Sequence, residues 1–229
     1  MIADEEAFLA PLIRQYKEIQ PYRKRIGFSY SDEETKPWIE ADKVDKGFYW
    51  MRYRRYLITV KHWNPATVNS MDADTNNILD SMADPSRTQP FDRRGLVVAS
   101  VQSGKTSNYI ALISKAADAG YRILIVLAGI TNELRNQTQK RIEEGFAGVD
   151  ISKNRNELVG AGLLDDSHSP VVITSRTRDY NKATADSNKG LFTKQVKAPM
   201  LFVIKKNVRS LRGLILWLKD NCPASEPLL

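Results

Sequence analysis

Short apolar runs alternate with helical patterns along the chain after Gly95. The runs are rich in β-branched residues and have the length of strands, and they read "GLVVAS", "YRILIVLAG", "PVVITS" and "MLFVIKK". Amphipathic segments lie between the first three runs and after the last, and they read "NYIALISKAADAG", "TNELRNQTQKRIEEGF" and "NVRSLRGLILWLKDN". Strands that alternate with helices predict a parallel sheet with both faces covered. We therefore expect an α/β domain over residues 91–229.

The ends of these helices carry their own signals. Gly120 can end the first helix, and Thr131 is suited to cap the second, with Gly145 placed beyond its end. In the first helix we expect one buried face, formed by Tyr109, Leu112, Ile113 and Ala116. In the last helix we expect a similar face, formed by Val208, Leu211, Leu214, Ile215 and Leu218.

Residues 1–90 show helical periodicity and no series of strands, which predicts a mainly helical N-terminal extension. One helix is expected around Phe8–Tyr16 and another between Pro65 and Pro85. The stretch between them, "GFYWMRYRRYLITVKHW", mixes aromatic residues with arginines. Such a mixture can stack on and neutralise a nucleic-acid strand, or it can be an amphipathic helix with its arginine heads in solvent.

The composition limits the classes of function. The 229 residues carry a formal net charge of +7, which suits either a polyanionic partner such as nucleic acid or simply a soluble surface. The one cysteine, Cys222, and the two histidines, His62 and His168, allow neither an internal disulfide nor a Cys/His zinc cluster. A reducing cytoplasmic setting is expected, because the sequence shows neither a signal peptide nor an apolar run of membrane-spanning length.

The segment "ASVQSGKTS", Ala99–Ser107, lies between the first expected strand and the first expected helix. Such a loop exposes backbone N–H groups toward a phosphate, and the helix behind it directs its positive end at the anion. Gly104 permits a close approach of the backbone, Lys105 supplies an ammonium for the β- and γ-phosphates, and Thr106 offers its hydroxyl to Mg²⁺. We expect ATP to be held by Ala99, Gln102, Ser103, Gly104, Lys105, Thr106 and Ser107, with Lys105 and Thr106 as the catalytic contacts.

Ala99 departs from the glycine that usually opens this motif, and the surroundings of the motif explain the departure. The segments "RRGLVVASVQSGKT", "KAADAGY", "LRNQTQ" and "FVIKKN" together resemble the ATPase region of the Z-one-domain proteins, a family often labelled as endonucleases. The resemblance covers residues 91–221 and implies the first RecA-like lobe of a helicase-like ATPase of superfamily two, in which alanine is common at this position.

The resemblance also implies partners. Such ATPases couple hydrolysis of ATP with Mg²⁺ to remodelling of nucleic acid, with DNA favoured over RNA, and family members occur in bacterial restriction and defence operons. The segment "LAGITNELRNQ" resembles a motif whose helix start touches the nucleic-acid backbone, which makes Thr131, Asn132 and Arg135 candidates. Lys205 and Lys206, at the exit of the last expected strand, are further candidates, because ligands of α/β sheets bind at this edge.

An Asp-Glu pair at the end of another strand is needed to hold Mg²⁺ and to polarise the attacking water. Asp165 and Asp166 follow a segment with poor strand character, and we do not assign them this role. We therefore expect this first lobe to be incomplete at its C-terminus, the second lobe to be missing, and the chain to depend on a C-terminal remainder and to turn over ATP weakly alone. The alternative is a module that senses nucleotide or docks a partner without hydrolysis.

Overall fold

The computed structural model describes residues 38–39, 46–87, 89, 91–98, 104–152, 156–180, 183, 186 and 198–221. The helix expected around Phe8–Tyr16 lies outside these residues. None of the helices in the described ranges combines the length and the apolar character that a membrane span requires.

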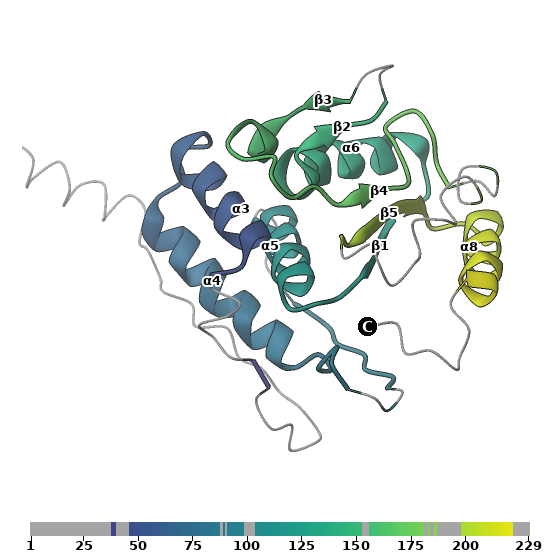
Figure 1. Cartoon of the computed structure of the whole chain (residues 1–229), viewed down its shortest axis with the longest axis horizontal. Helices are drawn as coiled ribbons and strands as arrows, with labels where there is room; N and C mark the ends of the chain where they lie inside the picture. The colour runs from purple at the N-terminus through teal and green to yellow at the C-terminus, as the bar shows by residue number, and fades with distance from the viewer. Residues whose placement is uncertain are drawn as a thin grey trace, which may run out of the picture.

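A parallel sheet lies at the centre of the chain (Figure 1). It has three strands, β1 (Ile123–Ala128), β5 (Met200–Lys205) and β4 (Val171–Val172), in the order β1-β5-β4. Leu124 of β1 pairs with Leu201 of β5 along a continuous parallel register. The predicted α/β class is confirmed as a small parallel sheet flanked by helices.

The two faces of the sheet are covered by different helices. Leu201 and Val203 of β5 join the core formed with α3 (Phe48–Thr59), α4 (Pro65–Asp80), α5 (Lys105–Asp118) and α6 (Asn132–Ile142). Met200, Phe202 and Ile204 point to the opposite face, as successive strand residues must, and pack with α8 (Val208–Asn221). In Figure 1, α3 and α4 lie side by side next to α5, and α8 lies on the other side of the sheet.

The aromatic and arginine-rich stretch forms α3, and its aromatic rings lie in the core. Trp50, Tyr53 and Tyr56 are buried, so they offer no stacking surface to a nucleic acid. Arg52 is buried as well, and its guanidinium donates to the carbonyl oxygens of Phe146 and Asp165. The packing interpretation of this stretch is confirmed, except that Arg52 is not in solvent. The helix expected after Pro65 is also confirmed as α4, with Asn64 as its cap.

The end of α6 differs from the prediction. Gly145 lies beyond Ile142, the last residue of α6, as expected, but the chain continues there into a π-helical turn, η1 (Glu143–Ala147), in which Gly145 is buried. The left-handed glycine that ends the turn is Gly148, with φ of 76°. The chain then forms a small antiparallel pair, β2 (Val149–Asp150) and β3 (Glu157–Leu158), and a 3₁₀ turn, η2 (Gly160–Leu163). A Cβ on Gly162 of η2 would lie 2.0 Å from the Gly148 carbonyl oxygen, so this close approach requires glycine.

Other predictions need correction. Gly95–Val98 belongs to no strand, and Leu96 and Val98 are 86% and 85% exposed. An apolar run becomes a strand only where a neighbour pairs with it, and in the described residues β1 pairs with β5 alone. β4 is also shorter than the expected run. On α8 the buried residues are Ser210, Leu214 and Trp217, whereas Val208 and Ile215 are exposed.

A carboxylate from the end of α5 holds the start of α3. Asp118 accepts the backbone N–H groups of Tyr49 at 3.0 Å and of Trp50 at 2.8 Å, which satisfies two donors that the first turn of a helix leaves free. Burial raises the pKa of Asp118 to about 6, and these bonds and the charges of Arg52 and Lys115 only partly oppose the rise. The junction of α3 and α5 is therefore sensitive to pH.

Asp118→Asn tests this sensitivity. Between the ordinary pKa of 3.8 and about 6, folded Asp118 holds a proton that the unfolded chain releases, so its contribution to the free energy of unfolding falls as pH rises through this window. The asparagine loses one acceptor at every pH but cannot titrate. We expect the stability of the wild type relative to Asp118→Asn to decrease by up to about 3 kcal/mol between pH 4 and 7. Denaturant unfolding across this range measures the difference, and parallel curves would contradict the assignment.

Candidate functional site

The first turn of α5 contains the described part of the expected phosphate cradle. Gly104 precedes the helix in the left-handed conformation, with φ of 75° and ψ of 25°, which favours glycine at this position. Lys105 is the first residue of α5 and its side chain is exposed. Thr106 and Ser107 follow and are half-buried. Ala99, Gln102 and Ser103 lie outside the described residues.

Side chains from α3 and α6 fix the position of this turn. Arg141, near the end of α6, donates from Nη1 to the Thr106 hydroxyl at 3.1 Å. The hydroxyl of Tyr109, one turn further along α5, interacts with Thr106 and with Thr138 of α6, and burial raises its pKa. Tyr53 of α3 donates to the Ser107 carbonyl at 3.5 Å. The turn therefore presents an exposed ammonium, a hydroxyl and a guanidinium at the positive end of a helix.

The second group of candidates lies at the carboxyl edge of the sheet. Thr131 caps α6 by accepting the Leu134 N–H at 3.2 Å, which confirms the predicted cap. The backbone N–H of Lys206 donates to the Gly129 carbonyl at 2.8 Å, so the exits of β1 and β5 are joined at this edge. Thr131, Asn132 and Lys206 are exposed there, whereas Lys205 is half-buried and its Nζ lies 3.7 Å from Asp179.

Arg135 does not lie on this surface. Its side chain is 2% exposed and passes beneath the loop that follows β4. Its guanidinium donates to the carbonyl oxygens of Ser175 at 2.8 Å and Arg176 at 2.9 Å, and more weakly to that of Val203 at 3.4 Å. Burial lowers the pKa of Arg135, and the nearby carboxylates of Asp179 and Glu143 oppose this. In this structure Arg135 stabilises the loop and has no access to a nucleic-acid strand.

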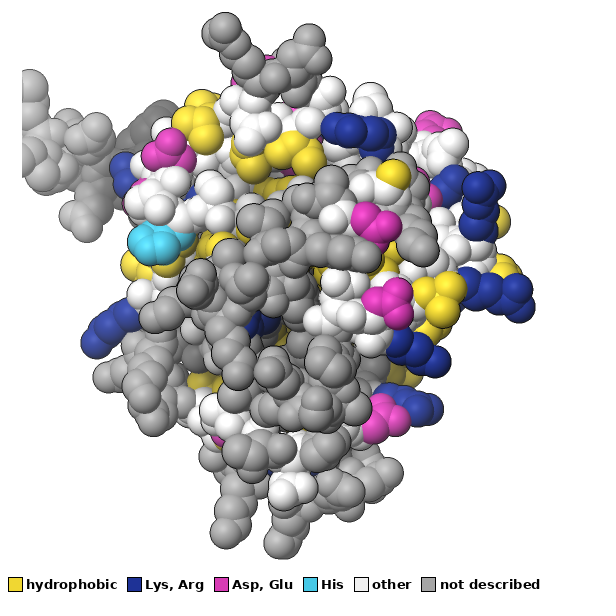
Figure 2. Space-filling view, turned by 45° about the vertical axis from the view of Figure 1, so that its right-hand side comes forward, with side chains coloured by type: hydrophobic (Ala, Val, Ile, Leu, Met, Phe, Trp, Pro, Cys, Tyr) yellow, Lys and Arg dark blue, Asp and Glu magenta, His cyan; other side chains and the backbone are white. Residues whose placement is uncertain are grey.

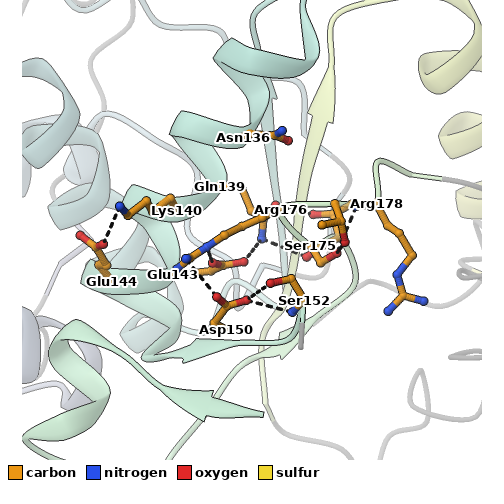
Figure 3. A network of polar contacts seen from close by, with 12 residues as sticks. Asn136, Gln139, Lys140, Glu143, Glu144, Asp150, Ser152, Ser175, Arg176 and Arg178 are labelled. Carbon is orange, nitrogen blue, oxygen red and sulfur yellow. Dashed lines mark hydrogen bonds and ion pairs between the residues drawn. The ribbon is translucent and has the colours of Figure 1, made fainter. Parts of the chain in front are cut away.

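A buried polar network joins α6 and η1 to the same loop (Figure 3). Gln139 donates to Glu143 at 2.9 Å and also bonds both oxygens of Thr174 at 2.9 Å. Arg176 forms ion pairs with Glu143 at 2.6 Å and with Asp150 at 3.0 Å. Burial raises the pKa of Glu143, while its bonds to Gln139 and Arg176 oppose the rise.

Sequence reasoning missed this network. A glutamine in a helix is normally interpreted as a surface residue. The one signal of burial was its position, because Gln139 lies four residues after Arg135 and three before Ile142, on one face of the helix. Arg141 was also missed, because two basic residues at the end of a helix are normally explained by the helix dipole.

Other polar clusters offer little chemistry. Asp165 and Asp166 are exposed in the turn between η2 and β4, and the structure gives no reason to assign them a catalytic role. A cavity of about 390 Å³ opens near β2 and β4, and Val149, Leu158, Asp166 and Val172 are among its lining residues. The described residues contain no group of three or more His, Cys, Asp or Glu side chains able to hold a metal ion.

Comparisons with protein-family models, with curated proteins and with solved structures find no match for this chain.

Proposed function

We propose that this chain is the nucleotide-binding part of a helicase-like, nucleic-acid-dependent ATPase with a RecA-like lobe, of the kind that its resemblance to the Z-one-domain proteins implies. The observation that carries the proposal is the Gly-Lys-Thr sequence at the first turn of α5, with Gly104 left-handed and Lys105 exposed. α5 flanks a parallel sheet, as the helix behind a phosphate-binding turn does, although residues 95–98 before the turn do not form the expected strand.

Each group at the turn has a task in this proposal. The backbone N–H groups of the first turn of α5 bind the β-phosphate, because they have no partner within the helix. Lys105 reaches the β- and γ-phosphates, and Thr106 provides a ligand for Mg²⁺. The bound ion neutralises the charge that develops on the phosphate oxygens during transfer.

Calorimetric titration of the wild-type protein with a non-hydrolysable ATP analogue and Mg²⁺ tests the proposal. We expect saturable binding of one nucleotide per chain, and an absence of binding would overturn the proposal. Hydrolysis of ATP in the presence and absence of DNA then separates the ATPase from a module that only senses nucleotide: a DNA-stimulated rate supports the ATPase.

A nucleic-acid strand would lie along the carboxyl edge of the sheet in this proposal. Thr131, Asn132 and Lys206 are exposed there, and the half-buried Lys205 can exchange its long contact of 3.7 Å with Asp179 for a phosphate. On the face shown in Figure 2, basic side chains alternate with acidic ones in the described part of the surface. The contact that the proposal expects is therefore the small one at this edge.

The salt dependence of DNA binding measures this contact. Replacing Lys205 and Lys206 by alanine should reduce the slope of log affinity against log salt by up to about two units, because each lysine that meets a phosphate releases about one counterion. Fluorescence anisotropy with single-stranded and duplex DNA over a salt series gives the slope. Lys219→Ala, near the opposite end of α8, is the control and should leave the slope unchanged. An equal loss of slope in the control would place the contact elsewhere.

A further inference from the structure

Among the described residues outside α5, one side chain donates a hydrogen bond to the Thr106 hydroxyl. This side chain is that of Arg141. Its Nη1 lies 3.1 Å from Thr106 Oγ1. Arg141 is exposed and lies in the last turn of α6, so its long side chain reaches across to the first turn of α5 from a different helix.

The charge of Arg141 is not neutralised by its acidic neighbours on α6 and η1. Glu143 is engaged by Gln139 and Arg176, and Glu144 lies 4.0 Å from Lys140. Among the described residues, no carboxylate forms an ion pair with Arg141. The guanidinium therefore carries a full positive charge to the hydroxyl that the proposed function assigns to Mg²⁺.

Two cations cannot share this hydroxyl. A magnesium ion binds an oxygen ligand at about 2.1 Å, so a guanidinium that stayed on the same oxygen would lie within about 5 Å of it. Like charges at such a distance repel, and the repulsion grows as a bound nucleotide displaces water from the site. One of the two must leave, and the arginine is on a flexible, exposed side chain.

Resting on the proposed function, we propose that Arg141 occupies the magnesium position on Thr106 in the nucleotide-free protein and is displaced when Mg²⁺ enters with the nucleotide. In the absence of metal, Arg141 remains beside the phosphates and supplies part of the missing positive charge. Arg141 then sets how strongly nucleotide binding depends on the metal, while Lys105 sets whether the nucleotide binds.

The measurable quantity is the ratio of affinities for a non-hydrolysable ATP analogue with Mg²⁺ and with chelator. Arg141→Ala should weaken metal-free binding by about tenfold, as expected for the loss of a charge-assisted hydrogen bond, and should leave the magnesium-dependent affinity equal or tighter. The ratio should therefore increase by at least about tenfold. Arg141→Lys keeps the charge and should stay near the wild type in this ratio.

Lys140→Ala is the matched control, since it removes the neighbouring positive charge on α6, whose partner in the described structure is Glu144 at 4.0 Å. Its ratio should equal that of the wild type. If Arg141→Ala lowers both affinities equally, or changes neither, while binding still requires Lys105, the proposal for Arg141 is wrong and the nucleotide site stands. If the wild type binds no nucleotide with or without Mg²⁺, the proposed function and the role of Arg141 both fail.

Discussion

Replacing Lys105 by alanine is expected to reduce the affinity for an ATP analogue with Mg²⁺ by at least about tenfold, and up to about a hundredfold, because a charge-assisted contact to phosphate is worth about 1.5–3 kcal/mol. The fold should be unaffected. Lys105 is exposed at the first position of α5, and among the described residues its side chain makes no hydrogen bond or ion pair. Calorimetric titration of the variant beside the wild type gives the loss directly.

Lys219→Ala is the control for net charge, because Lys219 is also exposed and lies on α8. It should bind the analogue as the wild type does. Equal affinities for the wild type and for Lys105→Ala would contradict the assignment of Lys105. Equal losses of affinity in Lys105→Ala and Lys219→Ala would show that the loss comes from the change in net charge and not from a contact at the site.

Replacing Arg135 by alanine is expected to destabilise the fold by about 3–5 kcal/mol, because each buried carbonyl oxygen left without its donor costs about 1–3 kcal/mol. The change leaves the carbonyl oxygens of Ser175 and Arg176 without their donor in a buried setting and opens a cavity between α6 and β5. For a chain of this size the melting temperature should fall by about 6–20 °C. Thermal unfolding followed by circular dichroism measures the shift.

Arg135→Lys separates shape from charge, since lysine keeps the charge but cannot reproduce the planar fork that reaches several carbonyl groups. It should recover only part of the stability. Arg212→Ala, on the exposed side of α8, should change stability by less than about 0.5 kcal/mol. If Arg135→Ala unfolds at the wild-type temperature and instead loses affinity for DNA, Arg135 is a surface contact and its buried arrangement is wrong.

Secondary structure was predictable wherever a local signal determined it. Thr131 caps α6 as expected, and Gly120, with φ of 105°, follows the end of α5. β1 and β5 are two of the expected apolar runs and they pair with each other, and β5 is buried on both faces, as its continuous apolar sequence indicates. These features depend on residues close in sequence or on a single pairing.

The tertiary features were not predictable, because they depend on which elements meet. Gly95–Val98 has the composition of a strand but no pairing partner in the described structure. Arg135 has the appearance of a surface residue, yet the loop after β4 covers it with carbonyl oxygens that only the folded chain brings there. Similarly, Arg141 and Thr106 are 35 residues apart, and nothing in either segment indicates their contact.

Hydrogen exchange with and without a non-hydrolysable ATP analogue and Mg²⁺ tests the central claim most directly, because it locates the bound nucleotide on the chain. The backbone amides at the start of α5, Lys105 to Ser107, have no partner within the helix and should exchange fast in the free protein. We predict that nucleotide slows their exchange in the wild type and has no such effect in Lys105→Ala at the same concentration. Saturable binding that protects another region, with the first turn of α5 unchanged, would contradict the account.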